Sequence, residues 1–179
     1  MTKAAADLGK QAKEPSLFDY QVYGPCWWRT TSTNLRAAAV ILLSRESDVR
    51  GPGLLLYGFA LENLLKGCLA AHLNEFGSCT DGHLPKKLNT HNLACLSRNC
   101  KFPASADDIR VFQTLTQWSE WRGRYHIPKA ENPPPDTNGR ECTLDVGVLD
   151  NLFDRVLRHF WQKMVGQADS RRADPGVPP

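Results

Sequence analysis

The sequence predicts an all-α fold, a bundle of four to five helices. Apolar residues recur three and four positions apart over several long segments, which is the period of one helical face. No segment alternates apolar and polar residues with the β-branched side chains typical of a strand. The 179 residues, 41% hydrophobic and 23% charged, suffice for one domain with a core of its own.

The first two helices are predicted over residues 27–45 and 53–73. A Gly51-Pro52-Gly53 sequence lies between them and predicts a break in the chain. The second helix has the wider apolar stripe, formed by Leu54, Leu55, Tyr57, Gly58, Leu61, Leu64, Leu65, Cys68 and Leu69. Glu62 precedes Lys66 by four residues on a flank of that stripe, the favourable order for a helical ion pair.

Two further helices are predicted in the middle of the chain. A short one spans 90–99, with Thr90 or Asn89 as its N-cap. The next begins at Ser105, and the two aspartates in its first turn complement the positive end of the helix dipole. Its apolar stripe consists of Ile109, Phe112, Leu115 and Ser119, with Trp118 and Trp121 beside it.

The last helix is predicted over about 143–165, after a proline-rich loop at 127–142. Its stripe consists of Val148, Leu149, Leu152, Phe153, Val156, Leu157, Phe160, Trp161 and Met164. Residues 1–15 and 167–179 contain few large apolar side chains, and we expect them to be disordered tails. The helical domain is then 16–166.

The charge balance and the cysteines bear on location. Lys and Arg exceed Asp and Glu by three, too mild an excess to require a nucleic-acid partner. The first residues have no apolar core like that of a signal peptide, and Ala37–Leu43 is too short to span a membrane. We therefore expect a cytoplasmic protein whose six cysteines are reduced thiols.

One arrangement of cysteines and histidines has ligand types that zinc accepts. Cys79 and His83 are followed by His91 and Cys95, which would share a helical face, and by Cys100. The paired Cys-x-x-Cys spacing of zinc-binding domains is absent. We expect no metal and no cofactor, and zinc remains the alternative.

Three motifs resemble the HEPN superfamily. They are a helix reading GFALENLLKGCLAAH, a helix start with His91 and Leu93, and a segment ending WRGRYHIP. The last is similar to the Trp-x-Gly-Arg-Tyr-Pro pattern of bacterial members, with His126 in place of the proline. The resemblance covers residues 27–165. It implies an antiparallel HEPN-like bundle, a homodimer, and RNA or nucleotide ligands in a bacterial defence or toxin–antitoxin system, beside a partner protein encoded nearby.

The same resemblance places the candidate site around Arg122 and His126. HEPN ribonucleases cleave RNA without metal through an arginine and a histidine separated by four to six residues, whereas three residues separate this pair. An arginine stabilises the charge of a phosphorane, and a histidine moves the 2′-hydroxyl proton. Arg124 would bind phosphate, and Tyr125 would stack on a base. The alternative places these side chains in the core and at the helix end.

Polar residues elsewhere complete the candidate ligand-binding set. The resemblance implies that Glu62 and Lys66 face the arginine–histidine cluster, and Glu62 would hold His91 or an arginine; the alternative is an ordinary surface pair. Arg155 and His159 have the same three-residue separation, and we expect them on the solvated surface of the last helix.

The function that we expect is nucleic-acid or nucleotide binding without catalysis. Two alternatives remain. The first is a metal-independent ribonuclease that uses the off-register Arg122 and His126 pair. The second is a non-catalytic interaction or dimerisation subunit.

Overall fold

The computed structural model describes residues 24–45, 49–71, 85–122 and 144–173, without the side chains of 121–122 and 167–173. Within these ranges all regular structure is helical and no strand occurs, which confirms the all-α class. The elements in chain order are α2 (Pro25–Leu43), α3 (Arg50–Ala70), α4 (Leu93–Asn99), α5 (Ala106–Gln117), the π-helical turn η3 (Trp118–Arg122) and α6 (Val146–Ala173). The predicted tail 1–15 and loop 127–142 lie outside the described residues.

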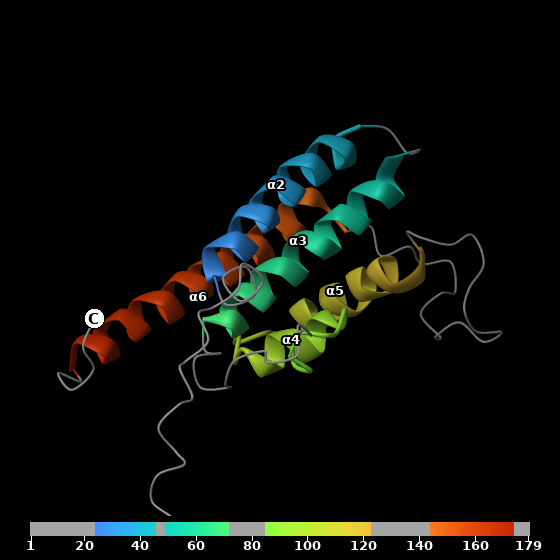
Figure 1. Cartoon of the computed structure of the whole chain (residues 1–179). Helices are drawn as coiled ribbons and strands as arrows, with labels where there is room; N and C mark the ends of the chain where they lie inside the picture. The colour runs from blue at the N-terminus through green and yellow to red at the C-terminus, as the bar shows by residue number, and fades with distance from the viewer. Residues whose placement is uncertain (1–23, 46–48, 72–84, 123–143, 174–179) are drawn as a thin grey trace, which may run out of the picture.

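Helix α3 is the centre of the bundle. The long helices α2 and α6 and the shorter α4 and α5 all pack against it (Figure 1). Most of its side chains are buried, including Tyr57, Leu61, Leu64 and Leu65. By length and composition α3 is also the one described helix apolar enough to cross a membrane, but 78% of that window is buried inside the bundle. Such burial is typical of a core helix.

The Gly51-Pro52-Gly53 sequence does not break the chain as predicted, because it forms the first turn of α3. Proline is tolerated there, since the N–H groups of a first turn have no partner within the helix. A Cβ atom on Gly53 would lie 2.8 Å from Leu43 Cγ. The glycine therefore allows α2 and α3 to approach closely.

The ends of the outer helices also differ from the prediction. Helix α2 begins two residues earlier than the predicted 27–45 and ends at Leu43. Ser32, in its middle, is buried and donates to the Ala60 carbonyl oxygen at 2.7 Å. Helix α6 begins at Val146 rather than 143 and continues to Ala173, inside the segment predicted to be a tail.

Side-chain caps fix the starts of α4 and α5. Helix α4 does not begin at residue 90, because the Asn92 side chain caps it and accepts from Cys95 N at 2.8 Å. Helix α5 begins directly after Ser105, as predicted. There the Ser105 hydroxyl accepts from Asp108 N, and the Asp108 carboxylate accepts from Ser105 N at 2.7 Å. This reciprocal capping box satisfies two backbone donors.

Apolar surface left outside the core lies on α2 and α6. The exposed large apolar side chains of the described residues are Trp27, Ile41, Val148, Trp161 and Val165. Val148 and Trp161 were assigned to the buried stripe of the last helix, and this assignment is wrong. Trp161 lies at the α2–α6 boundary, where the Arg29 guanidinium is 5.2 Å from its ring centroid. The homodimer stays a prediction.

Substitution of Leu61 by alanine tests the position of the core. Leu61 is fully buried, whereas Ile41 is 58% exposed. Leu61→Ala should lower the free energy of unfolding by about 2–5 kcal/mol, because it leaves a cavity. Ile41→Ala, the control, should change it by less than about 0.5 kcal/mol. Urea unfolding followed by circular dichroism measures both, and equal effects would contradict this arrangement.

Candidate functional site

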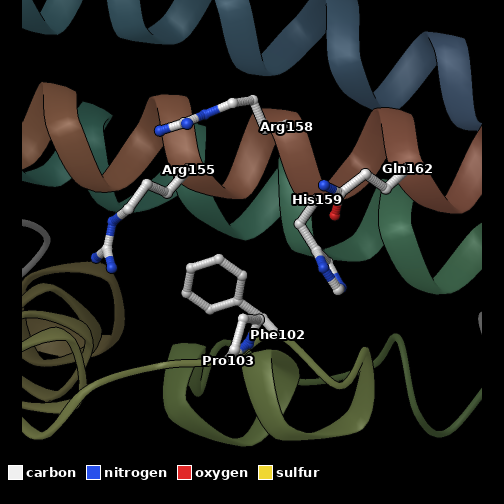
Figure 2. A pocket seen from close by; sticks show the side chains of 6 residues that line it. All are labelled: Phe102, Pro103, Arg155, Arg158, His159 and Gln162. Atoms are coloured by element: carbon white, nitrogen blue, oxygen red, sulfur yellow. The ribbon is translucent and has the colours of Figure 1, made fainter.

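A row of polar side chains along α6 lines an open pocket of about 230 Å³, which we call the α6 groove (Figure 2). Its lining residues are Phe102, Pro103, Arg155, Arg158, His159 and Gln162. The four from α6 are spaced at i, i+3, i+4 and i+7, so they share one helical face. Figure 2 shows the Phe102 ring between Arg155 and His159, while Arg158 extends along α6. Phe102 thus forms the floor of the groove.

The end of α4 places Phe102 in that position. Lys101 has a left-handed backbone, with φ 56°. The N–H of Phe102 donates to the Ser97 carbonyl at 2.9 Å, and the N–H of Lys101 donates to the Arg98 carbonyl at 3.0 Å. This is the Schellman pattern, here with lysine where glycine is usual. It reverses the chain and buries the Phe102 ring against Phe112, at a centroid separation of 6.2 Å.

Arg155 is held by Asp108, the capping residue of α5. The guanidinium and the Asp108 carboxylate form an ion pair, and Asp108 is 6% exposed. Burial raises the pKa of Asp108, but hydrogen bonds from Arg155 and Ser105 lower it by more, so the pKa lies below its usual value. The Nε atom of Arg155 is buried and has no acceptor among the described residues. The side chain as a whole is 33% exposed, so Arg155 forms part of the groove wall.

His159 is fixed by a backbone carbonyl. Its Nε2 lies 3.0 Å from the Cys100 carbonyl oxygen and must carry a proton, because a carbonyl only accepts. The imidazole is buried, and its centroid is 5.6 Å from that of Phe102 in an edge-on arrangement. The remaining nitrogen, Nδ1, makes no hydrogen bond within the described residues. The ring is thus held in one orientation beside the groove.

The expectation that Arg155 and His159 lie on a solvated surface is wrong. Both interact with the segment from Cys100 to Asp108, which covers this face of α6. Arg158, on the same helix, is exposed, and its Nε makes a long hydrogen bond, 3.4 Å, to the Asp154 carbonyl. The spacing of Arg155 and His159, adjacent to the apolar stripe, was the signal available in the sequence.

Glu62 and Lys66 on α3 form a second polar cluster with His91, which lies just before α4. Lys66 Nζ lies 2.7 Å from Glu62 Oε1, and His91 Nδ1 lies 3.0 Å from Glu62 Oε2. Glu62 and Lys66 are 5% and 6% exposed, so they are not an ordinary surface pair. The contact between Glu62 and His91, one of two partners considered for Glu62, is present. His91 is half-exposed, so the cluster reaches the surface at that residue.

The arginine–histidine candidates lie mostly outside the described residues. Arg122 is the last residue of η3, and its side chain is not described, while Arg124, Tyr125 and His126 follow it. A Cβ atom on Gly58 would lie 2.5 Å from Ser119 Oγ, so η3 packs tightly on α3. The structure therefore places the start of this segment against α3, and the pairing of Arg122 with His126 stays a prediction.

In the described part of the chain, no three His, Cys, Asp or Glu side chains lie close enough together to hold a metal ion such as zinc. Cys79 and His83 lie outside it. The prediction that His91 and Cys95 share a helical face is wrong, because α4 begins only after His91. Cys95 Sγ instead lies 3.6 Å from Asn99 Nδ2.

Cys68 and Cys100 are buried free thiols. Hydrogen bonding between them raises the pKa of Cys68, which burial raises further, and lowers the pKa of Cys100. The Cys100 thiol also lies 3.3 Å from the Ser97 carbonyl oxygen. Both thiols are therefore part of the packing between α3 and the end of α4.

Removing only the charge of Lys66 should destabilise the protein more than replacing both Glu62 and Lys66 with apolar residues. Lys66→Met leaves a buried carboxylate with one fewer partner and should cost on the order of 3 kcal/mol. The double variant Glu62→Leu/Lys66→Met should lose less than that single change. Chemical denaturation measures both, with Arg110→Met in an exposed pair as the control. A loss below about 1 kcal/mol for Lys66→Met would argue against this account.

The ion pair between Asp108 and Arg155 should appear in the pH dependence of stability. A carboxylate whose pKa is lower in the folded state stabilises the fold above its unfolded value, about 3.9, and this contribution is lost as pH falls through the folded pKa. Asp108→Asn should cost about 1–2 kcal/mol at pH 7. Its loss of stability from pH 5 to pH 3 should then be smaller than that of the unchanged protein. Asp107→Asn, at an 85% exposed side chain, is the control. If the free energy of unfolding fell equally with pH in Asp108→Asn and in the unchanged protein, the ion pair would not be the cause of the pH dependence.

The α6 groove has the chemistry of an anion site. Two guanidinium groups and an imidazole surround one hollow with an aromatic floor, and carboxylates and phosphates are the ligands that arginine binds best. No protein-family model, curated protein or solved structure matched this chain in the comparisons.

Proposed function

We propose that this chain is a helical module that binds nucleic acid or a nucleotide through phosphate held in the α6 groove, without catalysis. One observation carries the proposal: Arg155, Arg158 and His159 share one face of α6 and line one open pocket. The resemblance of the sequence to the HEPN superfamily implies the same class of ligand. Arg122 and His126, the pair that the same resemblance implies, stay a prediction.

The hydrogen-bonding groups of the groove favour phosphate. Arg155, which the ion pair with Asp108 holds in place, contributes a fixed cationic side chain to the lining. Arg158 is exposed at the rim, where its guanidinium is open to solvent. Gln162 adds an amide donor on the same helical face.

The surroundings of His159 argue for binding rather than cleavage. A general base must exchange protons with the substrate, so the imidazole has to reach the attacking hydroxyl. Here the ring is buried, and one of its two nitrogens is bonded to the Cys100 carbonyl. Asp108 also neutralises part of the charge on Arg155, which a cleavage site would direct at the phosphorane.

Binding of fluorescein-labelled single-stranded RNA, followed by anisotropy at low ionic strength, tests the proposal. Arg158→Gln should weaken binding about tenfold and reduce the slope of log affinity against log salt concentration by about 1. Arg110→Gln is the control, because Arg110 is an exposed arginine on α5 paired with Asp107. It should change affinity less than about twofold, since that arginine does not line the groove.

Two results would contradict the proposal. Absence of RNA or nucleotide binding at low salt would favour a non-catalytic interaction subunit. Chelator-resistant RNA cleavage that is lost in His159→Gln, with binding retained, would instead show a metal-independent ribonuclease.

A further inference from the structure

We infer that Cys68 and Cys100 are a redox pair, in which a small peroxide oxidises Cys100 and Cys68 then closes a reversible disulfide between α3 and the end of α4. The inference concerns a modification site and does not depend on phosphate binding in the α6 groove. The oxidant is a hydroperoxide, of which hydrogen peroxide is the smallest.

The two thiols already lie in contact. Cys68 is on α3 and Cys100 is the C-cap residue of α4, and the two residues are 0% and 1% exposed. The Cys68 thiol donates a hydrogen bond to Cys100 Sγ, and the Cys100 thiol donates to the Ser97 carbonyl oxygen at 3.3 Å. This hydrogen bond places the two sulfur atoms directly beside each other. Formation of an S–S bond therefore requires side-chain rotation rather than movement of a helix.

The surroundings of Cys100 favour its thiolate form. The hydrogen bond from Cys68 lowers the pKa of Cys100; burial raises it, but the backbone N–H of Phe102 and the positive charge of Lys163 lower it further. The same hydrogen bond between the thiols, together with burial, raises the pKa of Cys68. Because the thiolate is the form that attacks a peroxide, Cys100 reacts first, and Cys68 stays beside it as a protonated thiol.

The disulfide forms in two balanced steps. The Cys100 sulfur attacks one oxygen of hydrogen peroxide, so that an S–O bond forms, the O–O bond breaks, and the other oxygen leaves as water with the thiol proton. The Cys68 sulfur then attacks the sulfur of this sulfenic acid. An S–S bond forms, the S–O bond breaks, and the leaving hydroxide takes the Cys68 proton and becomes water. The two thiols lose two electrons and two protons, and one peroxide is reduced to two waters.

Burial decides which oxidants react with the pair. A bulky disulfide such as glutathione disulfide must align its S–S bond with the attacking sulfur, and the 1% exposure of Cys100 leaves no room for that approach. Hydrogen peroxide is little larger than water and enters during small local openings. Cys26 is exposed and has no such protection. The adjacent Cys68 thiol also traps the sulfenic acid before further oxidation.

Peptide mass spectrometry of the full chain, treated with hydrogen peroxide in native buffer, tests the inference. The Cys68–Cys100 disulfide should form while circular dichroism shows the protein folded, and dithiothreitol should restore both thiols. The control variant Cys26→Ala/Cys95→Ala should form the same disulfide at a rate within about twofold of the unchanged protein. Hydrogen peroxide should form it at least about tenfold faster than glutathione disulfide at equal concentration.

Two single variants test the separate roles of the cysteines. Each is treated with peroxide and then with dimedone, which labels sulfenic acids, added together with urea so that buried residues are reached. In Cys68→Ser, the sulfenic acid on Cys100 has no resolving thiol and should be labelled. In Cys100→Ser, Cys68 should stay unlabelled, because its thiol keeps its proton. The disulfide of the unchanged protein is measured independently of how well these variants fold.

Four results would overturn the inference in whole or in part. If Cys68 and Cys100 stay reduced while Cys26 is oxidised, the pair is not redox-active. A disulfide that forms only in urea gives the same conclusion, because the folded arrangement would then not promote it. Labelling of Cys68 but not of Cys100 would overturn the order of reaction. Equal rates with hydrogen peroxide and glutathione disulfide would overturn the restriction to small peroxides.

Discussion

Burial of α3 within the bundle is the constraint on which the rest of the structure depends. Because other helices cover α3, every polar side chain on it must find a partner inside the protein. Glu62 meets Lys66 and His91 on the side of α4. On the side of α2 and α6, the Tyr57 hydroxyl donates to Asp150, which also accepts from Arg36 at 2.7 Å. The polar contacts of α3 thus reach α6 through Asp150 and the segment before α4 through His91, while Arg36 ties α2 to the same Asp150 carboxylate.

Burial between the helices changes the pKa values of both groups in the contact between Tyr57 and Asp150. Burial and the hydrogen bond to Asp150 raise the pKa of Tyr57 well above its usual value. Burial raises the pKa of Asp150, but hydrogen bonds from Arg36 and Tyr57 lower it by more. The phenol therefore stays protonated and the carboxylate ionised, so donor and acceptor remain matched in the core.

Sequence periodicity predicted the helices that pack along most of their length. The stripes of α3 and α6 and the Ser105 cap of α5 were identified because each depends on neighbours within one helix. The Gly-Pro-Gly start of α3 was missed, since close approach to α2 decides it. The groove was missed for a similar reason: Arg155 and His159 belong to the site only because a segment some 50 residues earlier in the chain folds over them. No local pattern contains that contact.

The length of α6 has a consequence for how the bundle opens. Its residues Leu149–Phe160 pack into the core, whereas no other described segment lies within 4 Å of a Cβ built on Gly166, and the helix continues to Ala173. Amide hydrogens in the packed turns exchange with solvent only when the whole bundle unfolds, and those in the last turns exchange through local fraying. One helix thus contains both strongly and weakly protected amides, and the α6 groove lies over the last turns of its packed part. Ligand held there would extend slow exchange toward the C-terminal end.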